Sequence, residues 1–141
     1  MKKNGFTLIE LMIVFIIIGI LSFFIYNIYF STIERARETS ARANLRLLHV
    51  AVEAYATDHE GRYPTATTLN DLYLNLKKYI PNGTFPENPY NNKPYSDENN
   101  EHYKITYTYD PSLNSYTLSV MDRFNQKVLL LLSNRIVLEG R

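Results

Sequence analysis

The hydrophobic pattern is dominated by a long apolar segment close to the N-terminus. Between Phe6 and Phe30 the only charged residue is Glu10, and residues 11–20 (LMIVFIIIGI) include no polar side chain. As a helix, this segment would rise about 37 Å at ~1.5 Å per residue, which is enough to cross a hydrocarbon core of roughly 30 Å. The pattern therefore predicts a membrane-spanning helix over residues 6–30.

The residues on either side of this segment predict its orientation and its retention. Lys2 and Lys3 precede it, and the positive-inside tendency places that end in the cytoplasm and the remainder of the chain outside. A secretory signal peptide would be cleaved after the apolar run, at small residues. Residues 26–31 (YNIYFS) offer no such site, so we expect the helix to remain in the mature protein.

Glu10 is a carboxylate only a few residues into the predicted span. A charge at the centre of a membrane helix costs at least ~2.5 kcal/mol even on lenient insertion scales. No cation lies between Glu10 and Arg35, and Lys2 or Lys3 could reach the carboxylate only by bending back. The position indicates a functional site whose partner comes from elsewhere; the alternative is a carboxylate that extends to the lipid headgroups.

Residues 5–11 (GFTLIEL), behind a short basic leader, resemble the processing and methylation motif of type IV prepilins and type II secretion pseudopilins. The resemblance implies that a prepilin peptidase cleaves between Gly5 and Phe6, that Phe6 becomes N-methylated, and that Glu10 is the motif glutamate. It also implies a partner for Glu10, namely the new α-ammonium group of Phe6 in a neighbouring subunit. Such a pair adds little net stability but is costly when halved, so it would set the register of assembly.

The same resemblance covers the rest of the span. Gly19 fits the family pattern and is expected to loosen the helix for assembly, whereas the family's usual proline is replaced by Asn27. We expect the chain to form a homopolymer through its N-terminal helices, with other pilins or pseudopilins and an inner-membrane assembly platform as further partners.

Helical character is predicted to continue beyond the span, because no proline occurs before Pro64 and no glycine between Gly19 and Gly61. Gly61 is expected to end the helix in the left-handed conformation. Small and aliphatic residues recur at helical spacing and are predicted to face the head domain: Ile33, Ala36, Ser40, Ala43, Leu47, Val50, Ala51 and Ala54. Leu45 and Leu48 lie off this face, and we interpret them as contacts between neighbouring subunits.

The remaining residues predict a small head. Residues 69–80 form a short amphipathic helix that ends at Pro81, and residues 81–101 form an ordered loop rich in proline and asparagine. Alternating residues then predict strands at 103–109 and 116–120, with further strand material at 128–132 and 135–138. Ten of the twelve tyrosines lie between Tyr55 and Tyr116 and are expected to pack in this core.

Together these patterns predict an α+β pilin fold, in which a long N-terminal helix packs on a small antiparallel sheet. In chain order, the resemblance implies a cleaved leader at 1–5, and the predicted parts that follow are a transmembrane helix and polymerisation segment at 6–30, the amphipathic half of the helix at 31–60, a variable loop region with a helix at 61–102, and the sheet at 103–141.

Composition excludes several functions. The net charge of +1 does not favour nucleic acid as a partner, although Arg35, Arg42 and Arg46 form a basic line. There is no cysteine, the three histidines have no metal-ligand spacing, and no catalytic motif is present, so we expect neither an enzyme nor a cofactor. The major pseudopilins, which residues 55–65 and 86–95 resemble, bind calcium in an acidic C-terminal loop. In residues 121–127 only Asp122 is acidic.

Three functions remain open from the sequence. The first is a pseudopilin of a type II secretion system, in the inner membrane and then in a periplasmic filament. The second is a true type IV pilin, which would build a surface fibre for adhesion, twitching motility or DNA uptake. The third is a membrane-tethered binding domain that never polymerises, but this function leaves the Gly5–Phe6 motif and Glu10 unexplained.

Overall fold

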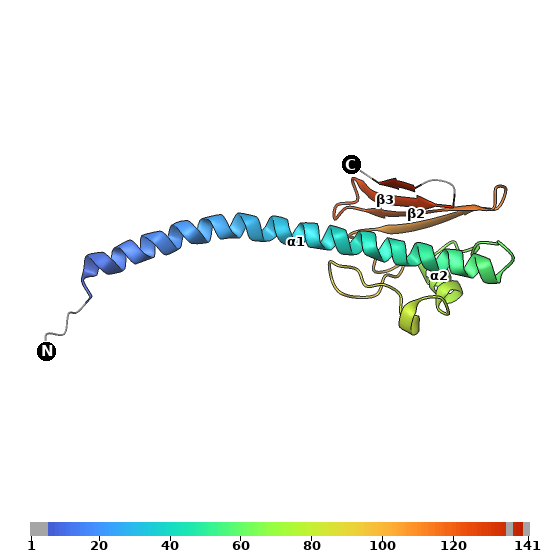
Figure 1. Ribbon diagram of the computed structural model, residues 1–141, viewed down its shortest axis with the longest axis horizontal. Helices are drawn as coiled ribbons and strands as arrows, with labels where there is room; N and C mark the ends of the chain where they lie inside the picture. The colour runs from blue at the N-terminus through green and yellow to red at the C-terminus, as the bar shows by residue number, and fades with distance from the viewer. Residues whose placement is uncertain (1–5, 135–136, 140–141) are drawn as a thin grey trace. The chain divides into compact units, whose positions relative to one another are not determined.

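A computed structural model describes residues 6–134 and 137–139, and these residues form the elements shown in Figure 1. The helices and strands are, in chain order, α1 (Leu8–Asp58), α2 (Leu69–Leu76), the 3-10 turn η1 (Pro81–Gly83), β1 (Ile105–Asp110), β2 (Ser115–Met121), β3 (Val128–Ser133) and β4 (Val137–Glu139). The chain divides into two compact units, residues 1–36 and residues 37–141, which we describe separately. The predicted α+β fold, with a long N-terminal helix and an antiparallel sheet, is confirmed.

Helix α1 ends with left-handed residues. The N–H of Gly61 donates to the carbonyl of Ala56 at 2.8 Å, and both Glu60 (φ 57°) and Gly61 (φ 82°) take positive φ. The expected left-handed conformation of Gly61 is therefore present. The helix ends at Asp58, slightly earlier than predicted, because Glu60 is already left-handed.

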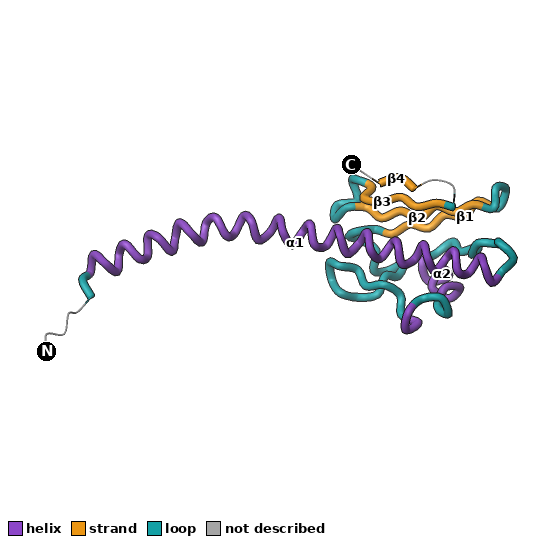
Figure 2. Tube along the Cα trace, in the orientation of Figure 1, coloured by secondary structure: helices purple, strands orange, loops and turns teal. Residues whose placement is uncertain are grey.

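The sheet is built from consecutive antiparallel hairpins in the order β1-β2-β3-β4. Burial alternates along β2, so Tyr116, Leu118 and Val120 face the core. Across the β1–β2 pair, Leu118 is opposite Tyr107, and Val120 is opposite Ile105. In Figure 2 the strands form one layer beside the second half of α1. The period of two in the sequence thus identified β1 and β2 and their buried face.

The face of α1 that packs on the head overlaps the predicted one only in part. Ala51 of the predicted stripe is buried and Leu47 packs against the core, but Val50 is 66% exposed. The buried positions centre instead on Leu45 and Leu48, both 0% exposed, with Ala41, Val52 and Ala56 also buried. Our interpretation of Leu45 and Leu48 as contacts between subunits is therefore wrong.

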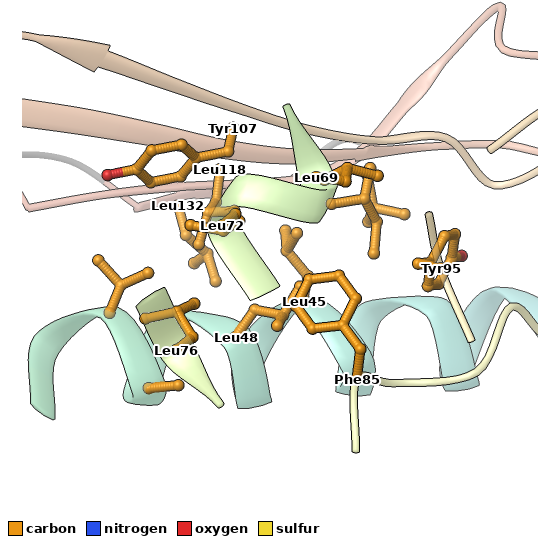
Figure 3. Close-up of a cluster of buried hydrophobic side chains, with 14 of the residues drawn as sticks. Leu45, Leu48, Leu69, Leu72, Leu76, Phe85, Tyr95, Tyr107, Leu118 and Leu132 are labelled. Atoms are coloured by element: carbon orange, nitrogen blue, oxygen red, sulfur yellow. The ribbon is translucent and has the colours of Figure 1, made fainter. Parts of the chain in front are cut away.

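The physical reason is the volume that the core must fill. The buried face of α1 meets leucines from α2 and from the sheet, as Figure 3 shows for Leu72, Leu76, Leu118 and Leu132. A close-packed interior needs large side chains where these elements meet. Leu45 and Leu48 supply that volume, and Ala51 of the predicted stripe packs beside them.

Polar contacts fix α1 against the sheet. The hydroxyl of Tyr116 donates to Glu53 Oε1 at 2.6 Å and lies 2.6 Å from Nδ1 of His49. A tyrosine hydroxyl has one proton, so with that proton on the side of Glu53, Nδ1 of His49 must be the donor in the second bond. Arg42 donates from its guanidinium to the carbonyl of Leu129 in β3. One member of the predicted basic line is therefore used within the head.

The region between α2 and β1 is ordered by side-chain to backbone bonds. Thr68 caps α2 by accepting the N–H of Asp71 at 3.1 Å, and the Asp97 carboxylate accepts the N–H groups of Leu69 and Asn70 at 2.8 and 3.2 Å. Within residues 81–101 the amide of Asn88, 1% exposed, donates across the loop to the carbonyl of His102 at 2.8 Å. The prediction of an ordered loop is confirmed, but its bonds join distant residues.

Three buried tyrosines predict a loss of stability in alkali. Burial raises the pKa of Tyr95, Tyr107 and Tyr116 above the ordinary value of about 10. Above that pH the unfolded chain releases these protons while the folded chain keeps them. The free energy of unfolding should therefore fall with rising pH, by up to about 4 kcal/mol per pH unit for three groups. Denaturant unfolding of the full chain in detergent at a series of pH values measures this slope.

A matched variant identifies the source of the slope. Tyr107→Phe keeps the ring and removes the hydroxyl, which donates to the carbonyl of Pro64 at 2.7 Å. This variant should lose about a third of the alkaline slope. A free energy of unfolding that stays constant through about pH 11 contradicts the assignment.

Candidate assembly site at the N-terminus of helix α1

The apolar segment of α1 exposes its side chains on every face. Within the first compact unit, the large apolar residues from Leu8 to Phe30 are exposed to between 45% (Val14) and 79% (Leu8). Soluble monomers rarely expose a contiguous apolar surface of this size. The segment meets the requirements of length and composition for a membrane span, and none of its most apolar stretch is buried.

The C-terminal end of the apolar segment carries aromatic residues. Tyr26 and Phe30 pack with ring centroids 4.6 Å apart, and Tyr29 lies 5.9 Å from Phe30. Tyrosines are enriched at the boundary between lipid and water, where the ring lies among the headgroups and the hydroxyl reaches water. Just beyond them, the hydroxyl of Thr32 donates to the carbonyl of Ile28 at 2.8 Å, and charged residues begin at Glu34.

A capping box starts the helix at its N-terminal end. Thr7 precedes the first helical residue, and its backbone N–H donates to Oε2 of Glu10 at 2.8 Å. The Thr7 hydroxyl donates to the same oxygen at 2.8 Å and accepts the N–H of Glu10 at 3.4 Å. This reciprocal pairing of an N-cap threonine with a glutamate three residues later satisfies two helix N–H groups that have no partner inside the helix. The carboxylate also lies at the positive end of the helix dipole.

The cap changes the account of Glu10. Thr7 was not among the predicted partners of Glu10, although the spacing of threonine and glutamate is the usual signal for a capping box. Only Oε2 is occupied by the cap. The second oxygen, Oε1, has no hydrogen-bond partner among residues 6–134 and 137–139. The carboxylate is thus held in place by its own chain, and one of its oxygens remains available to an outside donor.

The other predicted site residues are placed as follows. Phe6 is 76% exposed and directly precedes the capping threonine, while Gly5 lies outside the described residues. At Gly19 no atom lies within 4 Å of the position that a Cβ would take, so this face of the helix is open in the single chain. The backbone is helical through Gly19 and Asn27. The roles of Gly5 and Phe6 in cleavage and methylation, and of Phe6 and Gly19 in assembly, remain predictions.

The described part of the chain offers no metal centre. Within residues 6–134 and 137–139 there is no group of three or more histidine, aspartate or glutamate side chains close enough to hold an ion. His49 and His102 instead contact Tyr116 and the carbonyl of Arg123. The chemistry available at the N-terminus is therefore a positioned carboxylate beside a large apolar surface.

Residues 1–26 match the prokaryotic N-terminal methylation motif. The matched range includes Gly5, Phe6 and Gly19. It also includes Thr7 and Glu10, so the capping box lies within the methylation motif.

The chain is also similar to a curated protein over a longer stretch. It is 31% identical over 80 residues to the type II secretion system core protein G of Aeromonas hydrophila, and the similarity covers 57% of this chain and 55% of that protein. The chain thus spans about half the length of the curated relative it matches. No solved structure matches the chain.

Proposed function

We propose that this protein is a structural pseudopilin of a type II protein secretion system. The observation that carries the proposal is the N-terminus of α1, where the capped Glu10 stands beside an apolar segment that is exposed on every face. The methylation motif and the similarity to a core protein G support the same function. The role is structural: the filament is built from these subunits, and the energy for its assembly comes from other proteins.

The proposed assembly step pairs two charges in an apolar setting. Prepilin peptidase cleaves between Gly5 and Phe6, which leaves an α-ammonium group on Phe6 that is then methylated. Oε1 of Glu10 in a neighbouring subunit accepts a hydrogen bond from this group, while Oε2 stays in the cap with Thr7. Since both charges leave water, each is costly without the other, and the pair fixes how far one helix is shifted along the next.

The proposed location follows from the same segment. The helix spans the inner membrane once, with Lys2 and Lys3 in the cytoplasm and the head outside. Apolar side chains on all faces of the helix contact lipid first and later the helices of other subunits. Other pseudopilins and the inner-membrane assembly platform are the expected partners of this exchange.

A deletion strain tests the function. Removing the gene for this chain should stop the export of proteins by the type II system of the host, and the wild-type chain supplied in trans should restore export. Surface fibres, twitching and DNA uptake should be unchanged. Normal export with loss of surface fibres would replace the proposal with that of a true pilus subunit.

A further inference from the structure

The turn between β2 and β3 combines an exposed aromatic ring with basic residues. Phe124 is 69% exposed, and it lies between Arg123 and the exposed Lys127. The turn is closed by its own bonds: the N–H of Asp122 donates to the carbonyl of Lys127 at 2.8 Å, and Asn125 takes positive φ (57°). The ring of Phe124 is therefore presented by an ordered turn.

A cluster of rings and guanidinium groups holds this turn against α1. The guanidinium carbons of Arg123 and of Arg37 in α1 lie 5.1 and 5.4 Å from the centroid of the Tyr90 ring. The His102 ring packs on Tyr90 with centroids 4.0 Å apart, and its Nδ1 donates to the carbonyl of Arg123 at 2.8 Å. Arg123 also lies 5.5 Å from the centroid of Phe124. A cation is attracted to the electron-rich face of an aromatic ring, so the cluster fixes the turn beside Arg37.

The turn lies at the end of the head that the chain enters from the apolar segment, because Arg37, the first residue of the head unit, belongs to the same cluster. The opposite turn, between β1 and β2, lies at the far end of α1, where Asn114 donates to the carbonyl of Gly61 at 2.8 Å. Figure 1 shows the two turns at opposite ends of β2. Arg37 follows Phe30 by only seven residues, so chain length alone limits their separation to roughly 25 Å.

We infer that the β2–β3 turn docks the head on the surface of a membrane that contains anionic lipids. An exposed aromatic ring enters the headgroup region, and basic side chains beside it meet the negative surface charge. Arg37, Arg123 and Lys127 would supply this charge. The inference rests on the proposed function, because the spanning helix must hold the head at the membrane.

Two acidic residues near the turn, Asp122 and Glu101, oppose the three basic residues Arg37, Arg123 and Lys127, which leaves an excess of one positive charge among these five. Asp122 belongs to the turn, but Oδ1 of its carboxylate accepts the N–H of Gln126 at 2.8 Å and is directed to the backbone of the turn. Glu101 lies beside the turn, where its carbonyl accepts from the Asn125 amide. Docking holds the head on the membrane before its subunit enters a filament, and assembly must release it.

Single tryptophan variants test the docking. The chain has no tryptophan, so Phe124→Trp introduces one indole reporter with little change in shape. The full chain is reconstituted in phosphatidylcholine vesicles with or without phosphatidylglycerol, both prepared with brominated acyl chains. With phosphatidylglycerol, the indole should lose emission intensity and its maximum should move to shorter wavelength. Both changes should diminish in phosphatidylcholine alone, at high salt, and when Lys127→Gln is added.

Two further variants separate the possible failures. Leu113→Trp places the indole on the β1–β2 turn, where Leu113 is 52% exposed, and it should not be quenched in either lipid. Phe15→Trp lies in the span and should be quenched in both. If Phe15→Trp is quenched while Phe124→Trp behaves like Leu113→Trp, or is quenched equally without anionic lipid, the docking inference is overturned and the proposed function stands. If Phe15→Trp is not quenched, the membrane span and the proposed function fail with it.

Discussion

Replacing Glu10 with glutamine is expected to abolish filament assembly and protein export while the start of α1 stays capped. Glutamine can accept the N–H of Thr7 as glutamate does, so the variant removes the charge and keeps the cap. A buried ion pair that loses one partner costs about 3–5 kcal/mol. This cost weakens each contact between subunits by roughly a hundredfold to several thousandfold. The measurement is protein export and the assembly of the pseudopilin filament in the deletion strain complemented with the variant.

Three observations control this experiment. The intact mass of membrane-extracted Glu10→Gln should still show the loss of residues 1–5 and the gain of one methyl group, so that a failure of assembly is not a failure of processing. Thr7→Ser keeps a capping hydroxyl and should assemble normally. Thr7→Val removes it and should cost only about 1 kcal/mol, so assembly should be weakened but not lost. Normal fibres from a processed Glu10→Gln chain would refute the pairing of Glu10 with Phe6.

Local signals in the sequence were sufficient to predict the elements of the fold. The run of apolar residues, the absence of helix breakers and the left-handed glycine at Gly61 located α1. Alternation along 103–109 and 116–120 located β1 and β2. These signals depend on the backbone and on near neighbours, which is why one sequence reveals them.

The buried face of α1 could not be chosen in the same way. Between Ala41 and Ala56 apolar residues occur on nearly every side of the helix, so periodicity leaves several faces open. What decides among them is the shape of the surface formed by α2 and the sheet, and this depends on contacts far apart in the chain. The bonds from Asp97 to α2 and from Asn88 to His102 are hidden for the same reason.

At the candidate site, the sequence-based prediction identified Glu10 but left out Thr7. Glu10 was identified because a charge in an apolar run is costly, and the expected compensation for that cost is an opposite charge. The structure shows that part of the cost is met by the hydrogen bonds of Thr7, which lies within the same motif. The spacing of Thr7 and Glu10 was visible in the sequence, so here the omission was one of interpretation.

Leu48→Ala is expected to remove a large share of the stability of the head. Leu48 is 0% exposed and packs in the core among Leu45, Leu72 and Leu76. Truncating a buried leucine costs about 2–5 kcal/mol, because apolar contacts are lost and a cavity remains. A domain is stable by only about 5–15 kcal/mol. We expect the midpoint of thermal unfolding to fall by roughly 10 °C or more, measured by the near-UV circular dichroism of the tyrosines in the detergent-solubilised full chain.

Val50→Ala is the matched control, because Val50 is on the same helix, only two residues away, and is 66% exposed. Its truncation should change the free energy of unfolding by no more than about 0.5 kcal/mol. The two variants together determine which face of α1 is buried in the single subunit. If Val50→Ala were the more destabilising, the face predicted from the sequence would be the buried one. If neither variant changed the unfolding midpoint while Leu48→Ala alone prevented fibre formation, Leu48 would be a contact between subunits after all. A large loss of stability for Leu48→Ala alone places Leu48 in the core of the head, so that the surface used between subunits must be formed by other residues of α1.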